Sequence, residues 1–228
     1  MNDLAKLLTG ISARAATHSA ASSLAASSPV FNASAGAANY RNGIRAAVRG
    51  LWLGAFDFYQ FYDALDVTIR NGLTTAWYEG AAECGILPAD LSPTERAAIA
   101  QAIAGELGHI DSFATEIEAG SKANGGKVGP LLARAEMWIL RYQDVVNRAK
   151  VMACADQKLE WVLGLTKEHC STCLKLTGKV KRASYWQQVG VRPQSPPNPL
   201  LECGGWACLC NLIITDAPMS KGPLPNLP

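Results

Sequence analysis

Cys170-Ser-Thr-Cys173 and, after twenty-nine intervening residues, Cys203-Gly-Gly-Trp-Ala-Cys208-Leu-Cys210 are the stretches that decide the fold. Two cysteines separated by two residues can point both sulfurs at one tetrahedral metal ion, at roughly 2.3 Å from zinc. The paired glycines of the second stretch allow the backbone to turn sharply beside the metal. A small module with a thin apolar core gains stability from such a ligand set. We therefore predict one structural zinc ion in this part of the chain.

Five thiols compete for the four places around this ion. The first candidate set is Cys170, Cys173, Cys208 and Cys210, with Cys203 as a rival fourth ligand. On a strand, the sulfurs of Cys208 and Cys210 would sit on successive pleats, so the two share a metal only where the chain bends. The alternative set is Cys170, Cys173, Cys203 and Cys208, which leaves Cys210 as a buried thiol. The sequence does not choose between these sets.

Disulfides and a redox or iron centre are the competing interpretations of these cysteines. The N-terminus lacks a secretory signal, because Lys6 and Arg14 fall where such a signal needs an apolar run. In a reducing cytoplasm, clustered cysteines indicate metal binding more often than disulfides. Cys84 and Cys154 lie in helical segments, and we expect them to be ordinary core residues. His169 is a weaker candidate ligand.

Upstream of the cysteines, the sequence predicts a helical body. We expect helices over residues 42–52, 57–84, 92–119 and 131–155, because apolar side chains of the longer segments recur every three or four residues. Gly54 is the expected break after the first helix, and Gly72 and Gly80 weaken the second. Ser92-Pro93-Thr94-Glu95 places a capping serine, a proline at the first helical position and a glutamate three residues after the cap. The last segment is the most regular, and we expect it to pack lengthwise against another helix of a bundle.

The cysteine-rich part predicts short strands instead. Alternating bulky residues indicate a strand over 158–164, and further strands are expected near 178–181 and 208–215. Ser184 can cap one helical turn, and residues 192–199 form an irregular loop by composition. The predicted fold class is α+β, a mainly helical N-terminal body with a small zinc-stapled module that contains strands. Its parts are a flexible Ala/Ser-rich arm (1–38), a helical bundle-like body (39–155), a Cys-rich zinc module (156–216) and a Pro-rich tail (217–228).

Composition and motifs exclude several function classes. The 228 residues carry a formal net charge of +2, which gives no argument for nucleic acid or for an acidic partner. No stretch approaches the roughly 18 consecutive apolar residues of a membrane span. Glu106-Leu-Gly-His109 is a single copy of a spacing that di-iron bundles use twice, and only three histidines are present. We therefore predict no catalytic residues and no enzymatic activity.

Aromatic and basic residues surround the cysteines. Trp161, Trp186 and Trp206 are expected to pack around the metal. Basic residues at 179–182 form a small cluster that a solvated edge explains at least as well as a DNA contact does. If the chain were an enzyme, it would need a cleft that holds carboxylates with shifted pKa values. The acidic residues between 57 and 79 are the candidates for such a site.

Several residues of the C-terminal third follow one characteristic order, which is Trp161, Thr166, Cys170-x-x-Cys173, Leu176-x-Gly178, Trp186, a proline-rich stretch and Leu201-x-Cys203-Gly-Gly-Trp206-x-Cys208-x-Cys210. This order resembles the ending of the tailed-phage head morphogenesis family, the Mu F-like minor head proteins. The resemblance covers about residues 130–215. That family commonly has an Asp before the first Cys and a His-Pro before a closing Cys-x-Cys, where this chain has Lys167-Glu168 and Cys203-Gly-Gly.

The resemblance implies a minor head component of a bacteriophage virion, associated with the portal or the inner capsid and needed for assembly or DNA delivery. Its expected partners are other virion proteins of the portal, capsid or neck in a multi-copy assembly, with packaged double-stranded DNA as a further candidate and no membrane. It would be assembled in the host cytoplasm and located in the virion. No activity is carried over, since the chain lacks the Arg…Ser-Thr-Ser…Glu-x-Glu pattern of ADP-ribosyltransferases. The alternative is a zinc-containing DNA-binding or regulatory protein.

Overall fold

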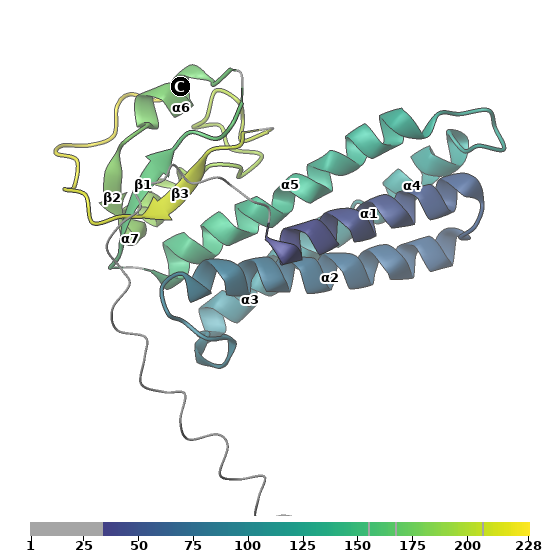
Figure 1. Cartoon of the computed structure of the whole chain (residues 1–228), viewed down its shortest axis with the longest axis horizontal. Helices are drawn as coiled ribbons and strands as arrows, with labels where there is room; N and C mark the ends of the chain where they lie inside the picture. Colours follow the sequence, from purple (N-terminus) through teal and green to yellow (C-terminus); the bar gives the residue numbers. More distant parts are fainter. Residues whose placement is uncertain (1–33, 155, 167, 207) are drawn as a thin grey trace, which may run out of the picture. The chain divides into compact units, whose positions relative to one another are not determined.

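A computed structural model describes residues 34–154, 156–166, 168–206 and 208–228. Most of the arm expected over residues 1–38 lies outside the described residues. The elements are, in chain order, helices α1 (Ala35–Leu53), α2 (Phe58–Ala82), the 3-10 helix η1 (Pro88–Asp90), α3 (Pro93–Leu107), α4 (Ile110–Ala119) and α5 (Val128–Ala153), strand β1 (Lys158–Val162), helix α6 (Ser171–Leu176), strand β2 (Val180–Arg182), helix α7 (Ala183–Val189) and strand β3 (Asn211–Ile214). The predicted α+β class is confirmed (Figure 1). None of the described helices combines the length and apolar character needed to cross a bilayer.

Helices α1, α2 and α5 lie side by side and form the centre of the body (Figure 1). Helix α1 begins seven residues earlier than the sequence pattern predicts. The reason is Ser34, which acts as the N-cap and accepts a hydrogen bond from the amide of Ala37 at 3.1 Å. The predicted break at Gly54 is confirmed, because this residue ends the helix in a left-handed conformation with a φ of 75°.

Helices α2 and α5 approach each other closely at a glycine. The predicted apolar stripe of α2 is confirmed, and Leu65, Ile69 and Trp77 on it are fully buried. The sequence treats Gly80 only as a weak point of the helix, whereas a Cβ atom there would lie 2.8 Å from the Cβ of Ala149 on α5. Ordinary packing leaves about 3.5–4.0 Å between carbon atoms. The contact between these helices therefore requires a residue without a side chain.

Residues 92–119 form two helices where the sequence pattern predicts one. The predicted capping box is confirmed, since the Ser92 hydroxyl accepts from the amide of Glu95 at 3.2 Å and the Glu95 carboxylate accepts from the amide of Ser92 at 2.9 Å. Helix α3 nevertheless ends directly before Gly108, and α4 starts two residues after it. Gly105 and Gly108 each lower the helix propensity by roughly 1 kcal/mol relative to alanine, which accounts for the break.

The three predicted strands form one antiparallel sheet in the order β2-β1-β3. Trp161 on β1 and Trp186 on α7 are fully buried, with ring centroids 5.8 Å apart. The indole nitrogen of Trp186 donates a hydrogen bond to the carbonyl of Leu159 at 3.1 Å. The two tryptophans thus form the core of the small module, and the sheet covers it.

The Pro-rich C-terminal residues, expected to form a tail without a core, pack on the module. Leu224 and Leu227 contact its apolar core. The amide of Ser220 donates to the carbonyl of Val180 at 2.9 Å, which covers the outer edge of β2. Lys181 is only 8% exposed and donates to the carbonyl of Ser220 at 2.8 Å. The expectation of a solvated edge is therefore wrong at this lysine.

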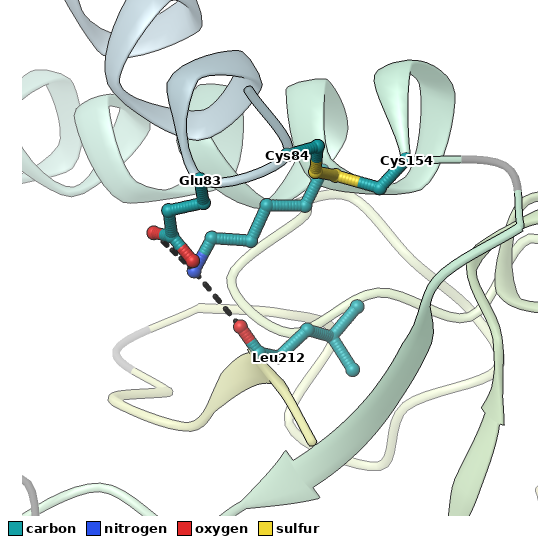
Figure 2. The surroundings of a disulfide bond; sticks show 5 residues. Glu83, Cys84, Cys154 and Leu212 are labelled. Carbon is teal, nitrogen blue, oxygen red and sulfur yellow. Dashed lines mark hydrogen bonds and ion pairs between the residues drawn. A yellow bond between two sulfur atoms is a disulfide. The ribbon is translucent and has the colours of Figure 1, made fainter. Parts of the chain in front are cut away.

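A buried lysine joins the body to the module, and a disulfide between two helices of the body lies beside it (Figure 2). Lys150 on α5 forms an ion pair with Glu83 at 2.8 Å and donates a hydrogen bond to the carbonyl of Leu212 on β3 at 2.9 Å. Beside it, Cys84 and Cys154 form a disulfide with their Cα atoms 5.6 Å apart. The prediction that these cysteines are ordinary core residues is wrong, because the ends of α2 and α5 meet only in the tertiary structure.

Candidate metal centre

The five cysteines predicted as metal ligands converge in space. Their sulfur atoms form two triads, Cys170–Cys173–Cys203 and Cys173–Cys208–Cys210, and within each triad all sulfurs lie within 4.8 Å of one another. Cys173 belongs to both triads. Its sulfur lies 3.6 Å from that of Cys208, whereas a disulfide bond is about 2.05 Å long. All five are free thiols, gathered as the ligands of a metal ion are.

The N-terminus of α6 positions the first cysteine pair. Cys170 is the N-cap of this helix, and its sulfur accepts a hydrogen bond from the amide of Cys173 at 3.4 Å. Burial raises the pKa of the Cys170 thiol, but this hydrogen bond and the contacts with Cys203 outweigh it, so the net shift is downward. The local structure therefore favours a thiolate at Cys170.

A pair of hydrogen bonds ties α6 to the stretch that carries the later cysteines. The carboxylate of Glu202 accepts from the amide of Ser171 at 2.6 Å. In return, the hydroxyl of Thr172 accepts from the amide of Glu202 at 3.1 Å. Since Glu202 directly precedes Cys203, these contacts hold the third sulfur of the first triad beside the other two.

The loop over residues 192–199, to which the sequence pattern assigns no role, supports the second triad. Gln194 is buried and donates its side-chain amide to the carbonyl of Cys210 at 2.8 Å. Gly205, with a φ of 82°, lies so close to Ser195 that a Cβ atom on it would be 2.8 Å from the carbonyl carbon of that serine. The loop thus holds both the glycine turn and the last ligand. No sequence motif predicts this role, because the residues in contact are not separated by a regular spacing along the chain.

Hydrogen-bond donors surround Cys210. The side chains of Cys173 and Cys208 contribute most to lowering the pKa of the Cys210 thiol, and the amide of Gly164 and the indole of Trp161 act in the same direction. The indole nitrogen of Trp161 is buried and has no hydrogen-bond partner among the described residues. Negative charge in the second triad is therefore favoured on Cys210.

Two residues that the sequence associates with the centre lie apart from the triads. The ring of His169 contacts the hydroxyl of Thr166 at 3.1 Å, and its nitrogens belong to neither triad. Trp206 is 43% exposed and, with Trp138 and Pro197, lines a cavity of about 430 Å³. The expectation that all three tryptophans pack around the metal thus holds for the two buried ones and is wrong for Trp206.

The buried carboxylates of the described chain have structural partners. Several acidic residues between 57 and 79 serve as a helix cap or as partners of neighbouring side chains. The carboxylates with raised pKa values are instead Glu106 and Asp144, in both cases chiefly because of burial. Arg141 lies 2.6 Å from Glu106 and 3.1 Å from Asp144, which Arg192 also contacts at 3.3 Å. This network connects α3, α5 and the loop that supports the cysteines.

The arrangement of the five cysteines suits the binding of a metal ion. Thiolates are soft ligands, and a cluster of five with hydrogen-bond donors around it can hold a metal ion that prefers sulfur. The structure brings all five predicted ligands together, and Cys173 lies between the two groups. Comparisons of the chain with protein-family models, with curated proteins and with solved structures gave no match.

Proposed function

We propose that this chain is a structural, non-enzymatic component of a tailed-phage virion that acts in head or portal assembly through protein contacts. The observation that carries the proposal is the convergence of five thiols from two distant stretches. The same cysteines carry the resemblance to the head morphogenesis family. A structural metal site gives a small module a fixed shape, which suits a subunit that must be recognised by its neighbours.

Thiol donors suit zinc, and one pair of them lies at the spacing that a tetrahedral zinc site needs. Four thiolates at roughly 2.3 Å from a tetrahedral zinc ion lie about 3.8 Å from one another. The sulfurs of Cys173 and Cys208 are 3.6 Å apart, and both candidate ligand sets contain this pair together with Cys170. The fourth ligand is then Cys203 from the first triad or Cys210 from the second.

Exposed leucines beside the thiols support a role in protein contacts. Leu174 follows Cys173 on α6 and is 56% exposed, and Leu209 is 41% exposed. Leu165 is 78% exposed, and the adjacent Gly164 packs against the backbone of Leu209. We infer that these leucines contribute to a contact surface, because exposed apolar patches mark interaction sites. A metal would hold this surface rigid, which lowers the entropy cost of binding a neighbouring subunit.

The alternative, a DNA-binding or regulatory protein, requires basic side chains that can reach phosphate groups. Lys158, Lys175 and Lys181 of the module instead donate hydrogen bonds to carbonyl groups within residues 216–226 of the same chain. These contacts fix the lysines against the protein. An affinity for DNA that falls steeply with salt concentration would favour the alternative over the proposal.

The metal part of the proposal is tested by mass spectrometry under native and denaturing conditions. We expect the native mass to exceed the denatured mass by one zinc ion. Cys173→Ser should abolish this difference, because Cys173 belongs to both ligand sets. Ser112→Ala, an exposed position on α4, is a matched control that should keep the zinc. A native mass without zinc and with the fold intact would contradict the proposed site.

The virion part is tested on particles. Phage particles purified by sedimentation and treated with nuclease and protease should contain peptides of this chain at a fixed ratio to the portal protein. A map of the intact particle should place the chain at the portal, neck or inner capsid. Recovery of the chain only in the unassembled fraction of the lysate would refute the virion role and leave the metal site unaffected.

A further inference from the structure

The number of ligand positions in the centre exceeds what one metal ion needs. Among the described residues, the sulfurs gather as two sets of three that share Cys173, rather than as one set of four. If the thiolate of Cys173 binds two ions at once, five sulfurs supply six ligand positions. Six positions complete two three-coordinate ions, whereas two tetrahedral zinc ions would need eight.

We propose that the centre can bind two copper(I) ions, one in each triad, with the thiolate of Cys173 as a bridging ligand. This inference rests on the proposed metal-binding function and extends it to a second ion. Thiolates are the soft ligands that select Cu(I), and this closed-shell ion is satisfied by three of them. Each thiol that binds copper releases its proton to the solvent, and no electron is transferred.

The distances within the triads suit three-coordinate ions. With metal–sulfur bonds of roughly 2.3 Å, the sulfurs of a planar three-coordinate site lie about 4.0 Å apart. All sulfurs of a triad lie within 4.8 Å of one another, and the Cys173–Cys208 pair is 3.6 Å apart. Rotation of the side chains by small angles therefore brings each triad to the required geometry.

The surroundings favour a low coordination number. Cys173, Cys208 and Cys210 are 2%, 8% and 1% exposed, so solvent does not supply a fourth ligand to the second triad. Cys170 and Cys203 in the first triad are half-buried, which leaves a route for ions from the solvent. The second triad is thus the more enclosed of the two, and the first is the more accessible to ions.

The test is an anaerobic titration of the full, metal-free chain with Cu(I), with bathocuproine disulfonate as competitor and native mass spectrometry as the count of bound ions. We expect two copper ions per chain and a copper–copper vector in the X-ray absorption spectrum. Cys203→Ser and Cys210→Ser each remove one ligand from one triad and keep four thiols, so each should bind one ion. The Cys84→Ala/Cys154→Ala variant, changed only at the disulfide, should still bind two.

The variant at the shared position tests the bridge. Cys173→Ser should lose the copper–copper vector, and two copper ions with that vector in this variant would refute a bridging Cys173. One copper ion in the unmodified chain, or two in Cys210→Ser, would overturn the proposal even if Cys173→Ser fails to fold. Bound zinc is counted in a separate titration of the same metal-free chain. One zinc ion and one copper ion per chain would agree with the proposed function and refute this inference. Two copper ions and no zinc would support this inference and refute the zinc part of the proposed function.

Discussion

Removal of the disulfide between Cys84 and Cys154 should cost this protein a large share of its stability. The bond joins the end of α2 to the end of α5, and the two cysteines have a sequence separation of 70. A cross-link removes conformations from the unfolded chain, and for a loop of this length the effect is roughly 4 kcal/mol at 25 °C. The Cα–Cα distance of 5.6 Å is usual for disulfides, so the bond spans the two helix ends without displacing them.

The change to make is Cys84→Ala/Cys154→Ala. Alanine is preferred over serine because Cys154 is 2% exposed, and a buried hydroxyl without a partner would add its own cost. A loss of about 4 kcal/mol is a large part of the 5–15 kcal/mol that stabilises a typical domain. For a chain of this size it lowers Tm by on the order of 10 °C. Urea unfolding followed by tryptophan fluorescence, at a fixed zinc concentration, measures the difference.

Reductant provides the matched control. The unmodified chain in reductant should unfold at the same urea concentration as the alanine variant, whereas the variant itself should not respond to reductant. Thiol titration gives a second, independent count. Of the seven cysteines, five should react in the unfolded, unreduced and chelator-treated chain. Seven reactive thiols, or equal unfolding midpoints with and without reductant, would show that the loop-closure reasoning is wrong.

The helix packing, the junction and the thiols each give one further prediction. Gly80→Ala places a Cβ 2.8 Å from that of Ala149 and should lower the free energy of unfolding in urea by about 1–3 kcal/mol. Gly105→Ala, with open space around the new Cβ, should raise the free energy of unfolding by up to about 1 kcal/mol. Equal effects of the two substitutions would contradict the close contact at Gly80. Lys150→Met leaves the carbonyl of Leu212 without its donor and should cost about 1–3 kcal/mol by the same assay, and an unchanged midpoint would contradict the role of the junction. Because protons compete with metal for thiolates, acidification below neutral pH should release zinc, measured with a chromophoric chelator, and retention at pH 4 would show that the thiolates are not the ligands.

Local patterns in the sequence predict most of the helical body. The capping box at Ser92 and the break at Gly54 are found as predicted, because each depends on contacts within one turn of the chain. The division of residues 92–119 into two helices is not predicted, since the apolar stripe continues across Gly108. Periodicity reports which face is buried, and it does not report where the backbone bends.

The candidate centre shows the same division between local and distant contacts. Cysteines at short spacing indicate a metal site by themselves, because two thiols on one turn reach the same ion. The support from Gln194 and Glu202 could not be predicted, since each contacts a residue many positions away through a single hydrogen bond. The proposal that Cys173 is shared also depends on coordinates, as sequence spacing does not distinguish it from Cys170.

By itself, the sequence of this protein determined the α+β class, the positions of the main helices and strands, and the five thiols that gather as candidate ligands. These follow from propensity, periodicity and spacing, which act over a few residues. Only the tertiary structure decided that Cys84 meets Cys154, that Lys150 joins body and module, and that the five sulfurs form two triads. Such contacts arise when whole elements pack to bury apolar surface, and the partners that packing brings together leave no pattern in the sequence.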